Sequence, residues 1–446
     1  MADPDDLTVR ELDSLWHPLR QHRGIAANRP AQIISGEGVH LIDREGNRLL
    51  DGVAGIWCVN VGYGREELAD VAREQMARLP YLPGTFVQAP AARLAGKLTA
   101  MLGYEGRVYF TNSGSEANEA AFKIARQYHA QTGSPGRFKI IARYRGYHGN
   151  TFGALAATGQ AERKMLYEPL APGFVHVDAP DPYRITHDCV DQLERAIARE
   201  GAETVAAFIM EPIIAGGGIL VPPDDYLPRV REVCTYHGVL LIVDEVVTGF
   251  GRTGISFAHR RAGIEPDLLT LGKGIASGYQ PLAAMVARQE IFDAFDGEAG
   301  DLRHFRHINT YGGHPVATAV ALRNIEIIER EGLIHRVAKT GEALLDRLRR
   351  LEKHPHVGQV RGRGLLIGVE LVESHASRQP IASDRSAAVV ARCARDGVLL
   401  GRTANTTPGF DNVVIMAPPF VLSEEEADVL ASTLERSIEE ELTKGP

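Results

Sequence analysis

The sequence has few cysteines, no long apolar run and no block of basic residues. Four cysteines are scattered over 446 residues without metal-ligand spacing, so neither a disulfide framework nor a metal site is expected. No stretch approaches the roughly 18 uncharged apolar residues of a membrane span. The formal net charge of -8 is spread along the chain, which argues against nucleic acid as a partner.

The amino terminus, Met1-Ala-Asp-Pro-Asp-Asp6, is acidic and lacks the apolar core of a secretion signal. Together with the few cysteines, this predicts a cytoplasmic protein. A chain of this length with 44% hydrophobic residues can bury a large core and is expected to form two domains. Residues 1–30 are polar with aromatic interruptions, as in a packed terminal arm or a part of a substrate tunnel.

The central half of the chain alternates buried strands with helices. Val205–Met210 and Leu240–Val243 are uninterrupted apolar runs, typical of strands buried on both faces of a parallel sheet. A helix is predicted between them over Asp225–His237, which favours a doubly wound α/β fold. Alternating short strands over 32–50 and after residue 360 predict smaller sheets near both ends of the chain.

Lys273 follows an apolar run and lies between Gly272 and Gly274. The pattern predicts a strand that ends in a tight turn, where a lysine can meet a ligand at close range. A desolvated lysine has a depressed pKa and can act as an amine nucleophile. The alternative is a solvated surface lysine, the commoner state of this residue type.

Asp244 lies at the carboxyl end of the Leu240–Val243 strand, where open α/β sheets bind their ligands. A carboxylate there can keep a proton on a heteroaromatic ring nitrogen, as pyridoxal phosphate requires. A carboxylate that caps the next turn is the alternative. Glu211 is a second carboxylate at a predicted strand tip.

Residues 111–118, Thr-Asn-Ser-Gly-Ser-Glu-Ala-Asn, follow a short predicted strand and open a helix. Free backbone N–H groups and two hydroxyls at a helix N-terminus form an anion site, most simply for a phosphate. An ordinary cap with Ser115 as the capping residue is the alternative. Farther along, Tyr147 could stack on an aromatic cofactor, whereas His148 could be structural or catalytic. Trp57 lies in a glycine-dense apolar stretch and is a candidate pocket wall.

These motifs, together with Val243-Asp-Glu-Val-Val-Thr-Gly-Phe-Gly-Arg-Thr-Gly254 and Thr270-Leu-Gly-Lys-Gly274, resemble the class III aminotransferases over nearly the whole chain. The resemblance implies the fold type I architecture of pyridoxal-phosphate enzymes, with a large doubly wound, mainly parallel-sheet domain and a smaller α+β domain built from both termini. The expected divisions are an arm and meander over 1–64, a cofactor domain over 65–325 and a small domain over 326–446. Residues 51–64 and 416–419 look more narrowly like pyruvate-dependent ω-aminotransferases. Trp16-His-Pro18 with Gln21-His22 looks like the taurine–pyruvate enzymes.

The resemblance assigns roles to individual residues. Lys273 would bind pyridoxal 5′-phosphate covalently and move the substrate proton, and Asp244 would keep the ring nitrogen protonated. Thr310 would reach the phosphate from a neighbouring subunit, which implies a homodimer with shared sites, or a tetramer of such subunits. The cofactor-binding residues would be Ser113, Gly114, Ser115, Tyr147, His148, Glu211, Asp244, Val246, Lys273 and Thr310.

The substrate pocket would be lined by Trp57, Phe86 and Tyr147. Arg402 matches the position of an arginine that pairs with the substrate carboxylate in pyruvate-dependent relatives, and a surface ion pair is the alternative for it. A departure follows it, because residues 403–412 form a longer loop than the amine-specialised members have.

The predicted function is a ping-pong transfer of an amino group from a primary amine or ω-amino acid, such as taurine or β-alanine, to pyruvate. The products would be alanine and an aldehyde or ketone. Three alternatives remain open: 2-oxoglutarate as the acceptor, a decarboxylase of the same fold, and an aminomutase of the same fold. A pure binding module is disfavoured because it needs no reactive lysine.

Overall fold

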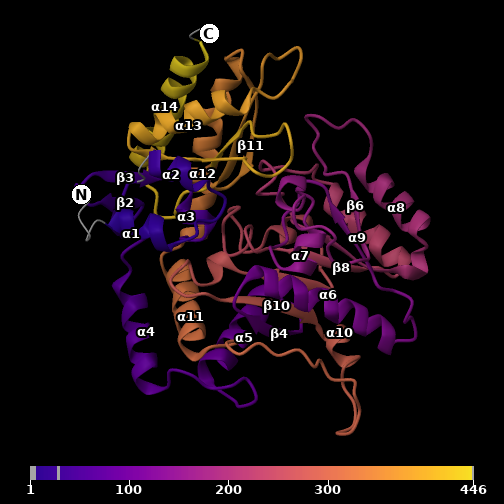
Figure 1. The fold of residues 1–446 in the computed structure, drawn as a ribbon. Helices are drawn as coiled ribbons and strands as arrows, with labels where there is room; N and C mark the ends of the chain where they lie inside the picture. The colour runs from indigo at the N-terminus through magenta and orange to yellow at the C-terminus, as the bar shows by residue number, and fades with distance from the viewer. Residues whose placement is uncertain (1–6, 28–30, 444–446) are drawn as a thin grey trace.

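A seven-stranded sheet forms the centre of the molecule (Figure 1). The structure, a computed structural model, describes residues 7–27 and 31–443. The order is β4-β10-β9-β8-β7-β5-β6; only β10 runs antiparallel to its neighbours. The strands are β4 (Gly106–Thr111), β5 (Lys139–Arg143), β6 (Phe174–Val177), β7 (Val205–Met210), β8 (Leu240–Asp244), β9 (Leu268–Leu271) and β10 (Ala283–Arg288).

Both faces of this sheet are buried, and its central strands β7, β8 and β9 are buried at every position. On β7, Phe208 joins one hydrophobic cluster and Ile209 the other. Alanines of α6 cover the second face, and helices α5, α8, α9 and α11 belong to the first cluster. The helices of this part are α4 (Glu66–Arg78), α5 (Ala89–Leu102), α6 (Gly114–Gln131), α7 (Phe152–Ala157), α8 (Cys189–Glu200), α9 (Tyr226–His237), α10 (Gln289–Asp293) and α11 (Pro315–Arg330).

Two four-stranded sheets complete the fold, in the orders β1-β2-β3-β13 and β11-β12-β15-β14. Because β13 pairs with β3, the two ends of the chain share one sheet. The strands are β1 (Ile33–Glu37), β2 (His40–Asp43), β3 (Arg48–Asp51), β11 (Val357–Arg363), β12 (Leu366–Leu371), β13 (Val398–Leu399), β14 (Gly401–Arg402) and β15 (Val413–Met416). The helices are α1 (Leu7–Ser14), α2 (His22–Ala27), α3 (Ala54–Trp57), α12 (Leu333–Arg349), α13 (Ser383–Arg395) and α14 (Glu424–Leu442).

The predicted α/β class with a large, mainly parallel sheet is confirmed. The stretch after residue 360 is a hairpin of β11 and β12 rather than one strand. The division of the chain at 64 and 325 stays a prediction, and the second boundary falls inside α11, which packs on α4 and α5.

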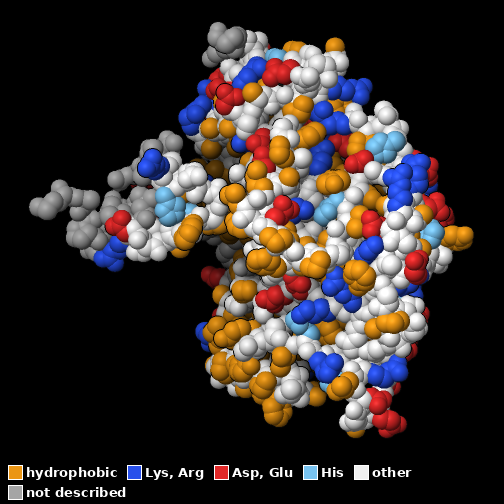
Figure 2. Space-filling model, turned by 45° about the vertical axis from the view of Figure 1, so that its right-hand side comes forward, with side chains coloured by type: hydrophobic (Ala, Val, Ile, Leu, Met, Phe, Trp, Pro, Cys, Tyr) orange, Lys and Arg blue, Asp and Glu red, His pale blue; other side chains and the backbone are white. Residues whose placement is uncertain are grey.

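Positive and negative side chains are interspersed over the face in Figure 2, without a continuous basic field. Among the described residues, no helix is long and apolar enough to cross a membrane. All four cysteines are unpaired thiols.

Candidate active site

The carboxyl ends of several parallel strands meet at one edge of the large sheet. There β7 leads to Glu211, β8 ends in Asp244, and β9 leads to Lys273. Strand β4 runs in the same direction as β9, since both pair antiparallel with β10, so the start of α6 reaches the same edge. A cavity of about 600 Å³ opens there.

Lys273 lies in this cavity, in a single 3-10 turn that follows β9. Its φ of 42° is in the left-handed region, a strained conformation for a residue with a side chain and one that clusters at functional sites. Burial lowers the pKa of Lys273, and the nearby Asp244 and Glu211 oppose that shift in part. The side-chain amine of Lys273 therefore loses its proton more readily than that of a surface lysine.

Asp244 is held on both carboxylate oxygens. Its Oδ1 accepts from the backbone N–H of Val246 at 3.0 Å, and its Oδ2 accepts from Asn118 Nδ2 and from His148 Nδ1, each at 2.9 Å. Asn118 is fixed in turn, because it also donates to the carbonyl of His148 at 2.7 Å and accepts from Thr270 Oγ1 at 2.9 Å. A buried carboxylate of fixed direction results.

Glu211 holds backbone around the cavity. Its two oxygens accept from the N–H groups of Tyr147 and Ala215, each at 3.0 Å. Burial raises the pKa of Glu211, and the neighbouring Asp244 adds to this. The geometry gives Glu211 a role that the sequence did not supply, which is to orient the loop that carries Tyr147.

The N-terminus of α6 forms the opposite end of the cavity. Its cap is Ser113, whose Oγ accepts from Glu116 N at 3.3 Å, so the expectation of Ser115 as the cap is wrong. Ser115 Oγ instead pairs with Asn150. A Cβ added to Gly114 would come within 2.9 Å of Val246, so only glycine lets the helix start and Val246 approach this closely.

The outer wall is formed by residues from other parts of the chain. Trp57 and Tyr147 line the cavity, as predicted from the sequence, together with Leu19, Gln160 and Arg163. Leu19 belongs to the amino-terminal arm, which thus contributes to the pocket. Burial raises the pKa of Tyr147, and the Arg163 guanidinium lies 5.4 Å from the centre of its ring.

Three of the predicted site residues do not line this cavity. Phe86 is 62% exposed and borders a separate hollow, beside the segment that carries Thr310. Thr310 is exposed, and its carbonyl accepts from the hydroxyl of Tyr81 at 3.0 Å. The guanidinium of Arg402 donates to Ser383 Oγ, Ser386 Oγ and the carbonyl of Asp411. Their cofactor and substrate roles stay predictions.

Sequence reasoning missed Asn118, Gln160 and Arg163. Asn118 closes the 111–118 motif and lies one helical turn past Gly114, on the strand side of α6, which was an available signal. Gln160 and Arg163 lie at the start and end of a single 3-10 turn, Ala161–Arg163, between α7 and β6, and no periodicity or motif points to them.

The family model described as aminotransferase class-III matches residues 25–438. The chain belongs to the class III aminotransferases. It is 48% identical to an uncharacterised aminotransferase of Bacillus subtilis, YhxA, covering 97% of this chain and 96% of the relative. It is also 40% identical to a taurine–pyruvate aminotransferase of Rhodobacter capsulatus, with 95% of each chain covered. A solved aminotransferase of Bacillus anthracis has a TM-score of 0.95 at 48% identity, with 98% of each chain covered.

Class III aminotransferases depend on pyridoxal phosphate, and an amine transaminase of an uncultivated Pseudomonas species, 38% identical, was solved in its PLP-bound form with a TM-score of 0.90 over 95% of this chain and 98% of that one. The residues present in this aminotransferase suit that group. A helix start offers backbone N–H groups to a phosphate, and Gly114 lets that helix start pack closely on Val246, which also lines the cavity. A buried carboxylate, Asp244, and the amine of Lys273 line the same cavity.

Proposed function

We propose that this aminotransferase takes the amino group of a primary amine, above all an ω-amino acid of the taurine or β-alanine type, and transfers it to pyruvate. The products are alanine and an aldehyde or ketone, formed in two half-reactions on one site. The observation that carries the donor class is the guanidinium of Arg163 on the cavity wall.

The cofactor is held by residues from the strand ends. Ser113, Gly114 and Ser115 would bind its phosphate, Asp244 would hold the ring nitrogen, and Lys273 would hold its aldehyde group. Tyr147 and Val246 would contact the ring. Glu211 holds the backbone N–H of Tyr147, and His148 donates to Asp244. When bound, pyridoxal phosphate supplies the electron-accepting ring that makes loss of a proton beside nitrogen feasible.

Lys273 is the base of the reaction. Burial lowers its pKa and so favours the neutral amine, whose Nζ removes the proton from the donor carbon that bears nitrogen. In the second half-reaction the same Nζ returns a proton to the carbon that came from pyruvate. Trp57 and Tyr147 enclose the donor and limit the access of water.

Arg163 recognises the distal acid group of the donor. Its Nε donates to Gln160 Oε1 at 3.0 Å and its guanidinium lies over the Tyr147 ring, and among the described residues no carboxylate pairs with it, so its Nη groups can donate to a ligand. A guanidinium suits planar carboxylates and sulfonates because it presents several donors in a fixed fork. The taurine–pyruvate relatives at 40% identity support this donor class and pyruvate as the acceptor.

Arg402 is less available to a substrate than Arg163, because its guanidinium already donates to Ser383, Ser386 and Asp411. A substrate that recruited Arg402 would have to replace those three bonds. Arg163 needs no such exchange, which makes it the better candidate for the first contact with an anionic donor.

The working unit is a homodimer. Phe86, Val87 and Ile308 are 62%, 93% and 78% exposed around one hollow, an unusual concentration of large apolar side chains for a free surface. A second copy of this chain would cover them and would bring Thr310 to the neighbouring site, as the family resemblance implies.

The test compares wild type with Arg163→Gln on taurine, β-alanine and butylamine, with pyruvate as the acceptor. A charge-assisted hydrogen bond contributes about 1.5–3 kcal/mol, so kcat/KM for the two acids should fall about 10- to 100-fold. Butylamine, which lacks the acid group, should change less than about threefold.

Lys164→Gln is the matched control, because it removes a neighbouring cation that does not line the cavity. It should leave all three donors near wild type. Equal losses on acids and butylamine in Arg163→Gln would contradict the proposed contact. The absorbance of the bound cofactor, bleached by a donor, should return with pyruvate and not with 2-oxoglutarate.

A further inference from the structure

The loop 403–412, which follows β14, is tied down at both ends. Thr403 and Asn412 are buried, and Thr403 Oγ1 donates to the carbonyl of Phe410 at 2.7 Å. Asn412 Nδ2 donates to the carbonyl of Leu371 on β12 at 2.7 Å. The loop therefore has one defined conformation against the body of the protein.

Phe410 is the contact that joins this loop to the large sheet. Two guanidinium groups lie against its ring, Arg145 at 4.6 Å and Arg184 at 5.3 Å from the ring centre. The attraction between a cation and the face of an aromatic ring is strongest where water is excluded. The loop is thus fastened to segments that lead from β5 and β6.

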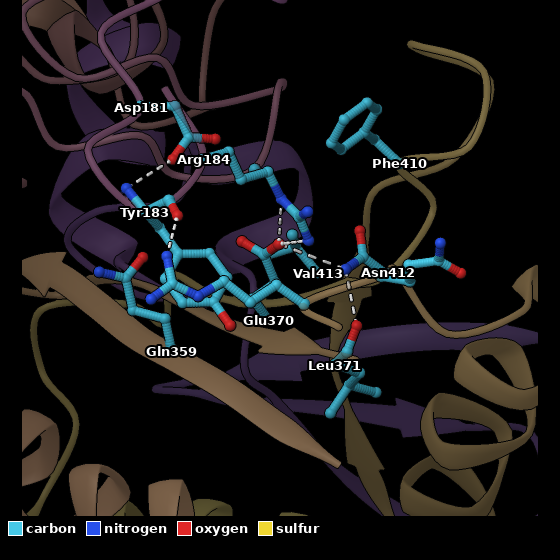
Figure 3. Close-up of polar contacts among 12 residues, drawn as sticks. Asp181, Tyr183, Arg184, Gln359, Glu370, Leu371, Phe410, Asn412 and Val413 are labelled. Carbon is cyan, nitrogen blue, oxygen red and sulfur yellow. Dashed lines mark hydrogen bonds and ion pairs between the residues drawn. The ribbon is translucent and has the colours of Figure 1, made fainter. Parts of the chain in front are cut away.

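Both arginines are themselves fixed. Arg145 donates to Asp181 at 2.6 Å and twice to the carbonyl of Gly217. Arg184 pairs with the fully buried Glu370, whose other oxygen pairs with Arg361. Figure 3 shows Glu370 facing Arg184, with Asn412 and Phe410 carried on the neighbouring loop.

Two short hydrogen-bond connections lead toward Arg163, one from Arg145 and one from loop 403–412. The carbonyl of Arg145 accepts from Gln160 Nε2 at 3.0 Å, and Gln160 Oε1 accepts from Arg163 Nε at 3.0 Å. From the loop itself, the carbonyl of Thr406 accepts from the N–H of Glu162 at 3.0 Å. These two hydrogen-bond connections therefore hold the backbone of Glu162, the residue before Arg163, and the side chain of Gln160, which accepts from Arg163.

We propose that loop 403–412 is a positioning element that acts through Phe410, Arg145 and Gln160 to hold Arg163 at the cavity wall, and so sets the preference for donors with a distal acid group. This rests on the role proposed for Arg163 above. The long loop, a departure from the amine-specialised pattern, thereby gains a function in donor selection although it does not line the cavity.

The experiment measures kcat and KM of Phe410→Ala and Phe410→Tyr for taurine, β-alanine and butylamine with pyruvate. Loss of the aromatic contact should raise KM for the two acids about fivefold with kcat within about twofold, since Phe410 is only half-buried and a solvent-accessible cation–π contact is of that strength. Butylamine should stay within about twofold, and Phe410→Tyr, which keeps the ring, should behave as wild type.

Phe292→Ala is the matched control, because Phe292 also lies under an arginine, Arg107 at 4.9 Å, but far from the cavity. It should leave donor preference unchanged. The double variant Arg163→Gln/Phe410→Ala should be no worse for acids than Arg163→Gln alone, because both changes act on one contact.

Equal losses on all three donors in Phe410→Ala, or a further loss in the double variant, would overturn the proposal. If Arg163→Gln removes the preference for donors with a distal acid group and Phe410→Ala keeps it, the proposal for the loop fails while the proposed role of Arg163 stands. If Arg163→Gln itself leaves the preference intact, the proposed donor contact fails, and the loop proposal with it. Phe410→Leu, with thermal melting of each variant, separates these outcomes from misfolding.

Discussion

Asn118→Ala tests the hydrogen-bond network around the buried carboxylate. The change removes a bond of 2.9 Å to Asp244, one of 2.7 Å to the carbonyl of His148, and one of 2.9 Å from Thr270. A bond to a charged group contributes about 1.5–3 kcal/mol and a neutral one about 0.5–1.5 kcal/mol. The three together predict a loss of about 4 kcal/mol in the free energy of unfolding.

Guanidinium unfolding of the apoenzyme measures this loss without any contribution from catalysis. Asn47→Ala is the matched control, because Asn47 also donates to a carboxylate, Asp43, at 2.9 Å but is exposed in a turn. Water can replace that amide, so the control should lose at most about 1 kcal/mol. In the same variants, equilibrium dialysis should find cofactor binding weakened about tenfold in Asn118→Ala alone.

A loss in Asn118→Ala no larger than in the control would refute the reasoning. So would unchanged cofactor affinity, because the direction of the Asp244 carboxylate would then not depend on Asn118.

Two further results are expected. Lys273→Ala should abolish turnover, and in the apoenzyme it should also remove a pH dependence of stability. The folded-state pKa of Lys273 lies below its ordinary 10.5, so between the two pKa values the folded chain binds fewer protons than the unfolded one. The stability of the wild type should therefore rise as pH increases toward 10.5. Unfolding midpoints measured from pH 7 upward should diverge between the two proteins, and parallel curves would contradict the shift. Ile308→Asp should place a charge in the exposed apolar hollow and give a monomer in sedimentation velocity with weaker cofactor retention, whereas a dimer of wild-type affinity would locate the interface elsewhere.

The strand ends could be predicted from the sequence because their signal is local. Apolar runs of six and four residues followed by Glu211 and Asp244, and the Leu-Leu-Thr-Leu-Gly segment before Lys273, define both the strand and the position of its functional side chain. The glycines at 114 and 272 add the close approaches that these turns need.

Arg163 could not be predicted, since nothing near it in the sequence indicates a pocket. Its Nε donates to Gln160, only three residues away, but Gln160 and the backbone of Glu162 are held by Arg145 and by the distant loop 403–412, which are tertiary contacts. Arg402 illustrates the converse. Its sequence position matches the family pattern, yet the local hydrogen bonds to Ser383 and Asp411, which no motif records, decide where its guanidinium lies.

The residues proposed for the cofactor and those of the outer wall come from different parts of the fold, which bears on how such an enzyme changes its range of donors. The groups proposed to face the cofactor come from the strand ends of one sheet, whereas Leu19, Trp57, Gln160 and Arg163 come from an arm, a glycine-rich stretch and a 3-10 turn between α7 and β6. Randomised libraries confined to these four positions can explore new donors while the chemistry stays intact. Natural drift over the same positions would let one ancestral catalyst diversify without passing through inactive intermediates.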